Sequence, residues 1–96
     1  MRIVWSKQAV LQLEKAYQDI ALDSIQAAAK VKDDLQEKIA GLLDFPERYP
    51  LDKFRKNNSG KVRAFEKHRY RVAYQVEKDH IRILRIRHTS MLPLDY

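Results

Sequence analysis

Residues 61–88 read KVRAFEKHRYRVAYQVEKDHIRILRIRH, and this stretch determines the fold that the sequence predicts. Apolar and charged residues alternate along it with the period of two that is typical of β-strands. The three predicted strands are residues 62–66, 70–77 and 81–88. Short turns near residues 67–68 and 78–79 join them into an antiparallel meander. The stretch therefore predicts a small sheet with one apolar face and one basic face.

The alternation assigns side chains to the two faces of this sheet. One face is apolar and is expected to pack against the two helices predicted in the first half of the chain. Its residues are Tyr70, Val72, Tyr74, Val76, Leu84 and Ile86. Arg71, Arg85 and Arg87 then point together to the opposite face, and Arg63 is expected to join them from the neighbouring strand. A single strand arginine is usually solvated or part of an ion pair, but several on one face indicate a working surface.

The first half of the chain predicts a short strand followed by two helices. Residues 2–5 are apolar and are followed by Ser6, which suits a helix N-cap. The apolar positions of the first helix recur at spacings of three and four, at Val10, Leu13, Tyr17 and Ile20, with Ala9 and Ala16 beside them, so this stripe is expected to be buried. A second apolar stripe runs over residues 24–42, and Pro46 prevents the helix from continuing. Two helices joined so closely form an antiparallel hairpin.

Length and composition limit the class of protein. With 96 residues the chain is expected to form a single domain, residues 1–96. Cysteine is absent, which excludes disulfides and thiolate metal sites, and we expect neither a metal nor a cofactor. No apolar run approaches the length of a membrane span, so we expect a cytoplasmic protein without membrane contact. The net charge of +6 favours an anionic partner.

A basic, irregular connection links the helices to the meander. Residues 46–60 read PERYPLDKFRKNNSG, where proline, asparagine and glycine predict a loop with a short edge strand near residues 51–54. The candidate nucleic-acid contacts in and beside this loop are Lys53, Arg55, Lys56 and Lys61, with Arg69 added from the basic face of the sheet. A basic loop of this kind is usually only solvated, but its cations are also suited to contact the phosphates of a nucleic acid.

The order of elements and several motifs resemble the RelE/ParE superfamily of bacterial type II toxin–antitoxin toxins. The similar stretches are SKQAV, LLDFPERYP, VRAFEKHRYRVAYQV with its YR-x-x-Y segment, and IRILRIRH. The resemblance implies an α+β fold: an N-terminal strand, then a helical hairpin packed on a mainly antiparallel sheet that ends in a three-strand meander. It also implies a small toxin that a cognate antitoxin neutralises by wrapping a largely disordered segment around it.

One branch of this superfamily, the RelE-like toxins, cuts messenger RNA on the ribosome by activating a ribose 2′-hydroxyl against the adjacent phosphate. This chemistry needs cations at the phosphate, a base and an acid, but no metal. By resemblance, the candidate catalytic residues are Arg71, Arg63, Arg85, Arg87 and His88. His88 is the acid or base candidate, yet alternation also places it on the core face as a structural histidine. The segment TSMLPLD before Tyr96 departs from the closing motif of the ribonucleases.

The ParE-like branch has a different mechanism, since its members block DNA gyrase without hydrolysing anything themselves. An incomplete catalytic set favours this branch, whereas the basic charge balance favours ribosomal RNA as the partner. A third function is a degenerate family member that only binds its partner or DNA. The sequence leaves all three functions open, because fold alone does not determine function.

Overall fold

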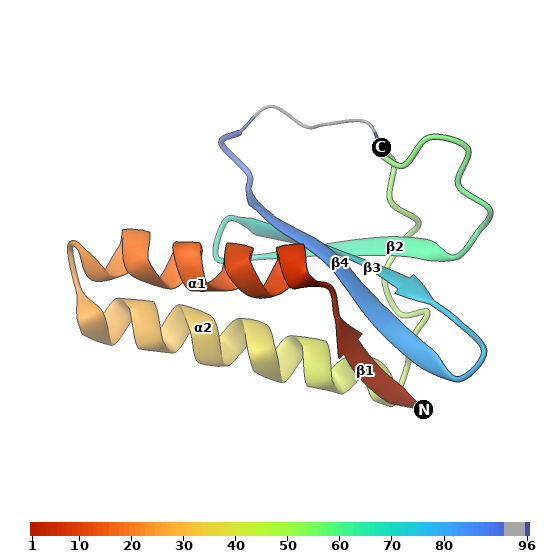
Figure 1. Cartoon of the computed structure of the whole chain (residues 1–96), viewed down its shortest axis with the longest axis horizontal. Coiled ribbons are helices and arrows are strands. Elements are labelled where there is room, and N and C mark those ends of the chain that lie inside the picture. The colour runs from red at the N-terminus through yellow and green to blue at the C-terminus, as the bar shows by residue number, and fades with distance from the viewer. Residues whose placement is uncertain (92–95) are drawn as a thin grey trace.

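The computed structural model describes residues 1–91 and 96, and these residues form four strands and two α-helices. The strands are β1 (Arg2–Trp5), β2 (Val62–Lys67), β3 (Tyr70–Val76) and β4 (His80–His88). The helices are α1 (Lys7–Ala21) and α2 (Ile25–Ala40), and a 3-10 turn (Gly41–Leu43) follows α2 (Figure 1). The predicted α+β class, with its helical hairpin and three-strand meander, is confirmed. Among the described residues, no helix has the length and apolar character needed to cross a membrane.

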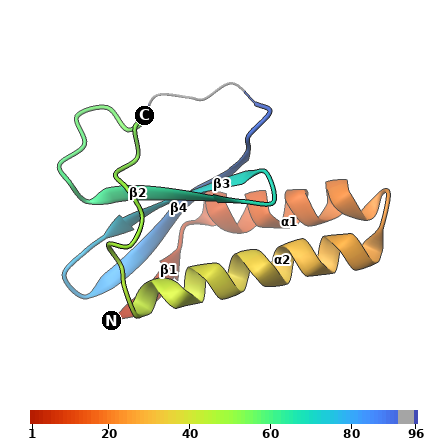
Figure 2. The same cartoon turned by 180° about the vertical axis from the view of Figure 1, so that it is seen from behind.

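The four strands form one mixed sheet in the order β1-β4-β3-β2. β1 runs parallel to β4, whereas β4 and β3, and β3 and β2, are antiparallel. The helical hairpin lies along one side of the sheet, and the loop before β2 and the C-terminal Tyr96 lie on the other (Figures 1 and 2). The sheet therefore has a helix-covered face, here called the core face, and an open face that only loops cover.

The buried core lies between the helical hairpin and the core face. Its largest fully buried side chains are Tyr74, Leu35, Ile39, Leu42, Ile81, Ile83 and Val72. On α1 the buried residues are Ala9, Leu13 and Ala16, whereas Val10, predicted to be buried, is 51% exposed. The spacing of three and four also fits Ala9, Leu13, Ala16 and Ile20. The prediction was wrong for Val10 alone, because the helix packs closely through Ala9 and Ala16, which lie beside the predicted stripe.

A β-bulge in β4 changes which of its residues face the core. Ala73 pairs with Arg85, but the next residue of β3, Tyr74, pairs with Ile83, so Leu84 is the extra residue. Ile83 is fully buried, and Leu84 is only half-buried. The prediction that Leu84 lies beneath the helices was therefore wrong. One inserted residue reverses the alternation on its N-terminal side, and the sequence pattern alone does not reveal this shift.

The turn between β2 and β3 consists of His68 and Arg69, one position later than predicted. Both residues have positive φ, 52° and 67°, which is the geometry of the two-residue type I′ hairpin turn. His68 Nε2 lies 2.6 Å from a carboxylate oxygen of Asp34 on α2, and this contact ties the turn to the helix. Arg69 is consequently at the tip of the hairpin and not on the open face beside Arg71.

The start of α1 also completes the edge of β4, because β1 is too short to pair with the whole strand. The Ser6 hydroxyl accepts a hydrogen bond from the Ala9 N–H (3.0 Å) and donates one to the Leu84 carbonyl (2.9 Å). The Gln12 side-chain oxygen then accepts from the Ile86 N–H (2.6 Å). The side chains of the N-cap residue Ser6 and of Gln12 on α1 thus bind backbone groups that a longer β1 would have bound.

Replacing Ser6 with alanine is expected to lower the free energy of unfolding by about 2 kcal/mol, because both the N-cap and the bond to Leu84 are lost. Ser24 is the matched control, since its hydroxyl caps α2 at the Ala27 N–H in an exposed position. For Ser24→Ala we expect only about 1 kcal/mol. Urea denaturation of both variants measures the difference, and equal losses would mean that the bond to Leu84 contributes nothing.

Candidate functional site

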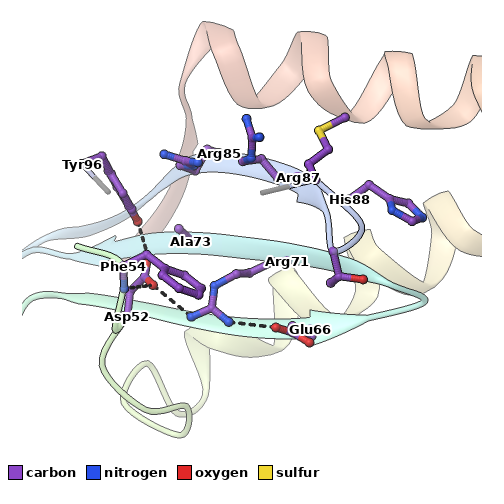
Figure 3. Close-up of a pocket in the computed structure, with 11 residues that line it drawn as sticks. Asp52, Phe54, Glu66, Arg71, Ala73, Arg85, Arg87, His88 and Tyr96 are labelled. Atoms are coloured by element: carbon purple, nitrogen blue, oxygen red, sulfur yellow. Dashed lines mark hydrogen bonds and ion pairs between the residues drawn. The ribbon is translucent and has the colours of Figure 1, made fainter. Parts of the chain in front are cut away.

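A small pocket of about 130 Å³ lies on the open face of the sheet, between β4, β3 and the loop before β2. Its lining residues are Asp52, Phe54, Glu66, Arg71, Ala73, Arg85, Arg87, His88, Thr89, Met91 and Tyr96 (Figure 3). Alternation explains why Arg71 and Arg87 point here, because they are direct cross-strand partners on the open face. Arg85 lies beside them because it pairs with Ala73 at the bulge.

Arg71 is held between two carboxylates. Its Nη2 lies 2.9 Å from Asp52 Oδ1, and its Nη1 lies 2.9 Å from Glu66 Oε2. The guanidinium carbon is also 4.8 Å from the centre of the Phe54 ring, which is a cation–π distance. The positive charge of Arg71 is therefore already matched within the chain, as the dashed lines of Figure 3 show.

Asp52 connects the loop, the sheet and the C-terminus. It is 3% exposed. Its Oδ1 accepts the Phe54 N–H (3.0 Å) in addition to Arg71, and its Oδ2 accepts the hydroxyl of Tyr96. Burial acts to raise the pKa of Asp52, but the hydrogen bonds from Tyr96, Arg71 and Phe54 outweigh burial, so the pKa lies below its usual value. Asp52 is thus an ionised carboxylate at neutral pH.

The aromatic ring of Tyr96 lies between two arginines. Its centre is 4.4 Å from the guanidinium carbon of Arg85 and 4.9 Å from that of Arg55. Backbone hydrogen bonds from Tyr96 N to Phe54 O (3.1 Å) and from Lys56 N to Tyr96 O (2.7 Å) fix the residue against the loop. Burial, followed by the neighbouring Asp52, raises the pKa of Tyr96, while burial lowers that of Arg85.

His88 lies at the margin of the pocket and also lines a groove beside α1. It pairs with Tyr70 across the strands, and the two rings meet edge to face at 5.1 Å. His88 Nδ1 accepts the Ser90 N–H (3.0 Å), so the neutral ring carries its proton on Nε2. This environment matches the structural interpretation of His88, although its position beside the pocket keeps it among the candidate residues.

The structure separates Arg63 from the other predicted arginines. Arg63 pairs with Tyr74 and shares the core face with it, and its Nη1 donates to the Tyr49 carbonyl at 2.6 Å. The expectation that it joins the open face was wrong, because both faces of β2 are covered. Val62 and Ala64 are buried on the open face, and Phe65 is buried on the core face. With apolar residues on both sides, alternation gives no signal for this strand.

The predicted basic contacts are distributed around the loop and do not form one cluster. Arg55 stacks on Tyr96, and the Lys53 ammonium is 5.2 Å from the centre of the Phe54 ring. Lys61 forms an exposed ion pair with Glu77 at 3.4 Å. The side chain of Lys56 is exposed. The predicted edge strand near residues 51–54 is a single bridge between Leu51 and Arg63.

Sequence reasoning missed Asp52 and considered Glu66 only as an available ion-pair partner of the strand arginines. Asp52 and Glu66 were not among the predicted site residues, and Tyr96 was considered only as a substitute for a ribonuclease tyrosine. One signal was available for Asp52, which is the single acidic residue in the otherwise basic segment 51–61. The apolar residues of the tail TSMLPLDY were expected to pack back onto the body. Met91 is 47% exposed, and the other apolar residues of this tail fall on residues 92–95, which lie outside the described residues.

Comparisons with known proteins agree with this fold. The model of the family described as "ParE toxin of type II toxin-antitoxin system, parDE" matches residues 3–93. A solved structure described as the chromosomal ParDE toxin–antitoxin system from P. aeruginosa is similar, with a TM-score of 0.72 and 23% identity over 92% of this chain and 95% of that chain. No curated protein sequence matches significantly. Since the family match covers nearly the whole sequence, this chain belongs to the ParE toxin family of type II toxin–antitoxin systems.

Proposed function

We propose that this chain, a toxin of a type II module with a cognate antitoxin as its partner, acts by binding DNA gyrase and hydrolyses nothing itself. Membership of the ParE family favours this mechanism over RNA cleavage, because the ParE-like branch inhibits gyrase. The proposal places its action in the cytoplasm, and it requires neither a metal nor a cofactor.

The observation that carries the proposal is the double ion pair of Arg71. In a ribonuclease of this fold, the arginine at this position has to meet the phosphate as negative charge develops. Here Asp52 and Glu66 both lie 2.9 Å from its guanidinium, so a phosphate would have to displace a carboxylate. The hydroxyl of Tyr96 is donated to Asp52 and has a raised pKa, which makes it a poor base at neutral pH.

The ribosome-dependent ribonuclease is retained as the second candidate, because Arg85, Arg87 and His88 line one pocket. A positioned imidazole beside two guanidinium groups is a combination that general acid–base cleavage of RNA can use. The two candidates make opposite predictions about RNA, and one pair of assays separates them.

Supercoiling by purified gyrase is expected to fall with added toxin, while messenger RNA on purified ribosomes stays intact in primer extension. Growth arrest in cells should accompany the loss of supercoiling. New RNA ends that disappear with Arg71→Ala would instead establish the ribonuclease, since loss of one such electrostatic contact costs about 10²–10³-fold in rate. If neither gyrase nor RNA is affected and growth continues, the chain serves only as a binding module.

A further inference from the structure

The loop before β2 contains a short turn with three cations, Lys53, Arg55 and Lys56, here called the basic turn. No acidic residue occurs from residue 53 to residue 61. Among residues 1–91 and 96, none of the three cations forms an ion pair. Acidic residues slightly outnumber basic ones in residues 1–44, so the net charge of +6 comes from residues 45–96. The basic turn is therefore an unbalanced positive part of the surface.

Aromatic rings hold two of these cations in place. The Lys53 ammonium lies 5.2 Å from the centre of the Phe54 ring, and the guanidinium carbon of Arg55 lies 4.9 Å from that of the Tyr96 ring. The Tyr96 carbonyl accepts the Lys56 N–H (2.7 Å), so the third cation extends from a fixed backbone position. A cation–π contact at an exposed site contributes about 0.5–1 kcal/mol. The side chains of Lys53 and Arg55 therefore lose part of their freedom before a partner binds.

The backbone of the turn is fixed by Asn58. Its side-chain nitrogen donates to the Val62 carbonyl (2.8 Å), and its side-chain oxygen accepts the Val62 N–H (3.3 Å). The Arg55 N–H donates to the Asp52 carbonyl (3.2 Å), which closes a β-turn over residues 52–55. A surface that is ordered before binding loses less entropy on association. The three cations are thus presented on a preorganised backbone.

The rings beside the turn indicate which kind of polyanion fits. Phe54 and Tyr96 each have two cations over the ring, one from the turn and one from the sheet. A nucleic-acid base could stack there only by displacing one of these cations, and recognition of single strands depends on such stacking. A duplex keeps its bases paired and presents a regular series of phosphates to cations. The arrangement therefore favours contact with a duplex backbone.

We infer that the basic turn binds the phosphate backbone of duplex DNA through Lys53, Arg55 and Lys56, without reading the base sequence. The choice of DNA rests on the proposed function, because the substrate of gyrase is duplex DNA. The toxin then contacts the DNA held by its target as well as the target itself. This contact also accounts for the positive charge balance without ribosomal RNA as the partner.

A fluorescently labelled DNA duplex, titrated with the whole chain and followed by fluorescence anisotropy, tests the inference in the absence of gyrase. We expect saturable binding with the same affinity for duplexes of different sequence. The logarithm of the binding constant should fall with the logarithm of the salt concentration with a slope of about −3, because each neutralised phosphate contributes about −0.9. Absence of binding at about 50 mM salt would overturn the inference.

A triple substitution connects the binding to the turn. Replacing Lys53, Arg55 and Lys56 together with glutamine should weaken DNA binding at low salt at least about a hundredfold and make the salt slope shallower by about 3. The matched control removes the same charge from exposed lysines of the two helices, at Lys7, Lys15 and Lys30. The control should keep the salt slope of the wild type. Equal losses in both variants would mean that only net charge matters, which contradicts a specific surface.

Asn58→Ala tests the preorganised backbone without changing the charge. We expect DNA binding to weaken about three- to tenfold, because the side chains of the turn have to be ordered on binding. The salt slope should stay the same, since the three cations are still present. Unchanged affinity in this variant would contradict the positioning role given to Asn58.

Three other ligands separate duplex DNA from alternative partners. Tighter binding of single-stranded DNA would contradict a contact to the backbone alone. Tighter binding of an RNA duplex of the same sequence would overturn the choice of DNA, and equal binding of polyglutamate would indicate an acidic protein as the partner. These titrations contain no gyrase, so their failure leaves the supercoiling result intact. A failure of gyrase inhibition likewise leaves the measured DNA affinity intact.

Discussion

Asp52→Asn is expected to lower the free energy of unfolding by about 3 kcal/mol, one of the two largest losses that we predict for a single substitution. The carboxylate is 3% exposed and accepts hydrogen bonds from Arg71, Phe54 and Tyr96. An asparagine offers one oxygen and one N–H₂ group, so a donor is placed against another donor. The variant also leaves the partly buried Arg71 with Glu66 as its remaining carboxylate partner.

Urea denaturation at neutral pH measures this loss, and Asp33→Asn on the exposed side of α2 is the matched control. We expect the control to change the free energy of unfolding by less than about 0.5 kcal/mol. Because the folded pKa of Asp52 is lowered, its contribution is present above the unfolded pKa of about 3.9 and is lost as the pH falls through the folded pKa. The difference between wild type and Asp52→Asn should therefore shrink below about pH 4, and a constant difference would contradict the ion pair.

Tyr74→Ala is expected to destabilise the protein at least as much as Asp52→Asn. We expect it to lower the free energy of unfolding by about 3–5 kcal/mol. Tyr74 is fully buried in the centre of the sheet, and its hydroxyl donates to the Pro46 carbonyl at 2.8 Å. The conservative change Tyr74→Phe should cost only about 1 kcal/mol, because it removes the hydrogen bond and keeps the packing. Tyr17→Phe on α1 is the control, since its hydroxyl has no hydrogen bond within the described part of the chain.

The buried phenol also predicts a loss of stability at alkaline pH. Burial raises the pKa of Tyr74 from 10.0 to about 12. Because the folded pKa of Tyr74 is raised, the neutral phenol stabilises the fold fully below about pH 10. This contribution is lost as the pH rises towards 12, and the free energy of unfolding is expected to fall by about 2–3 kcal/mol. Tyr70 and Tyr96 act in the same direction. Denaturation of wild type and Tyr74→Phe across this range isolates Tyr74, and identical profiles would show that Tyr74 does not ionise on unfolding.

These two residues link stability to the pocket. Tyr74 anchors the connection at Pro46 to the sheet, and Asp52, six residues later in the same connection, binds the sheet again through Arg71. The loop is therefore attached at both points by side chains that are buried.

Local sequence patterns were sufficient to predict the helices and main strands of this fold and the positions of some site residues. Alternation over residues 61–88 predicts strands, spacing of three and four predicts the helices, and both follow from fixed backbone periods. The same alternation brings Arg71 and Arg87 to one face, because cross-strand partners always share a face. The basic open face was thus determined by the sequence itself.

Only the tertiary structure decided which residues of each periodic pattern face the core and which groups pair with each charged side chain. The bulge at Leu84 broke the alternation in β4, and buried apolar residues on both faces of β2 left no alternation from which to place Arg63. The hydrogen bond of Tyr96 to Asp52 joins residues 44 positions apart, and that of Asp52 to Arg71 joins residues 19 positions apart. No local period encodes such contacts, since they depend on how the loop and the C-terminus fold across the sheet. For this reason the sequence placed Arg71 and Arg87 on one face, whereas the tertiary structure decided the positions of Arg63 and Arg69 and the carboxylates that pair with Arg71.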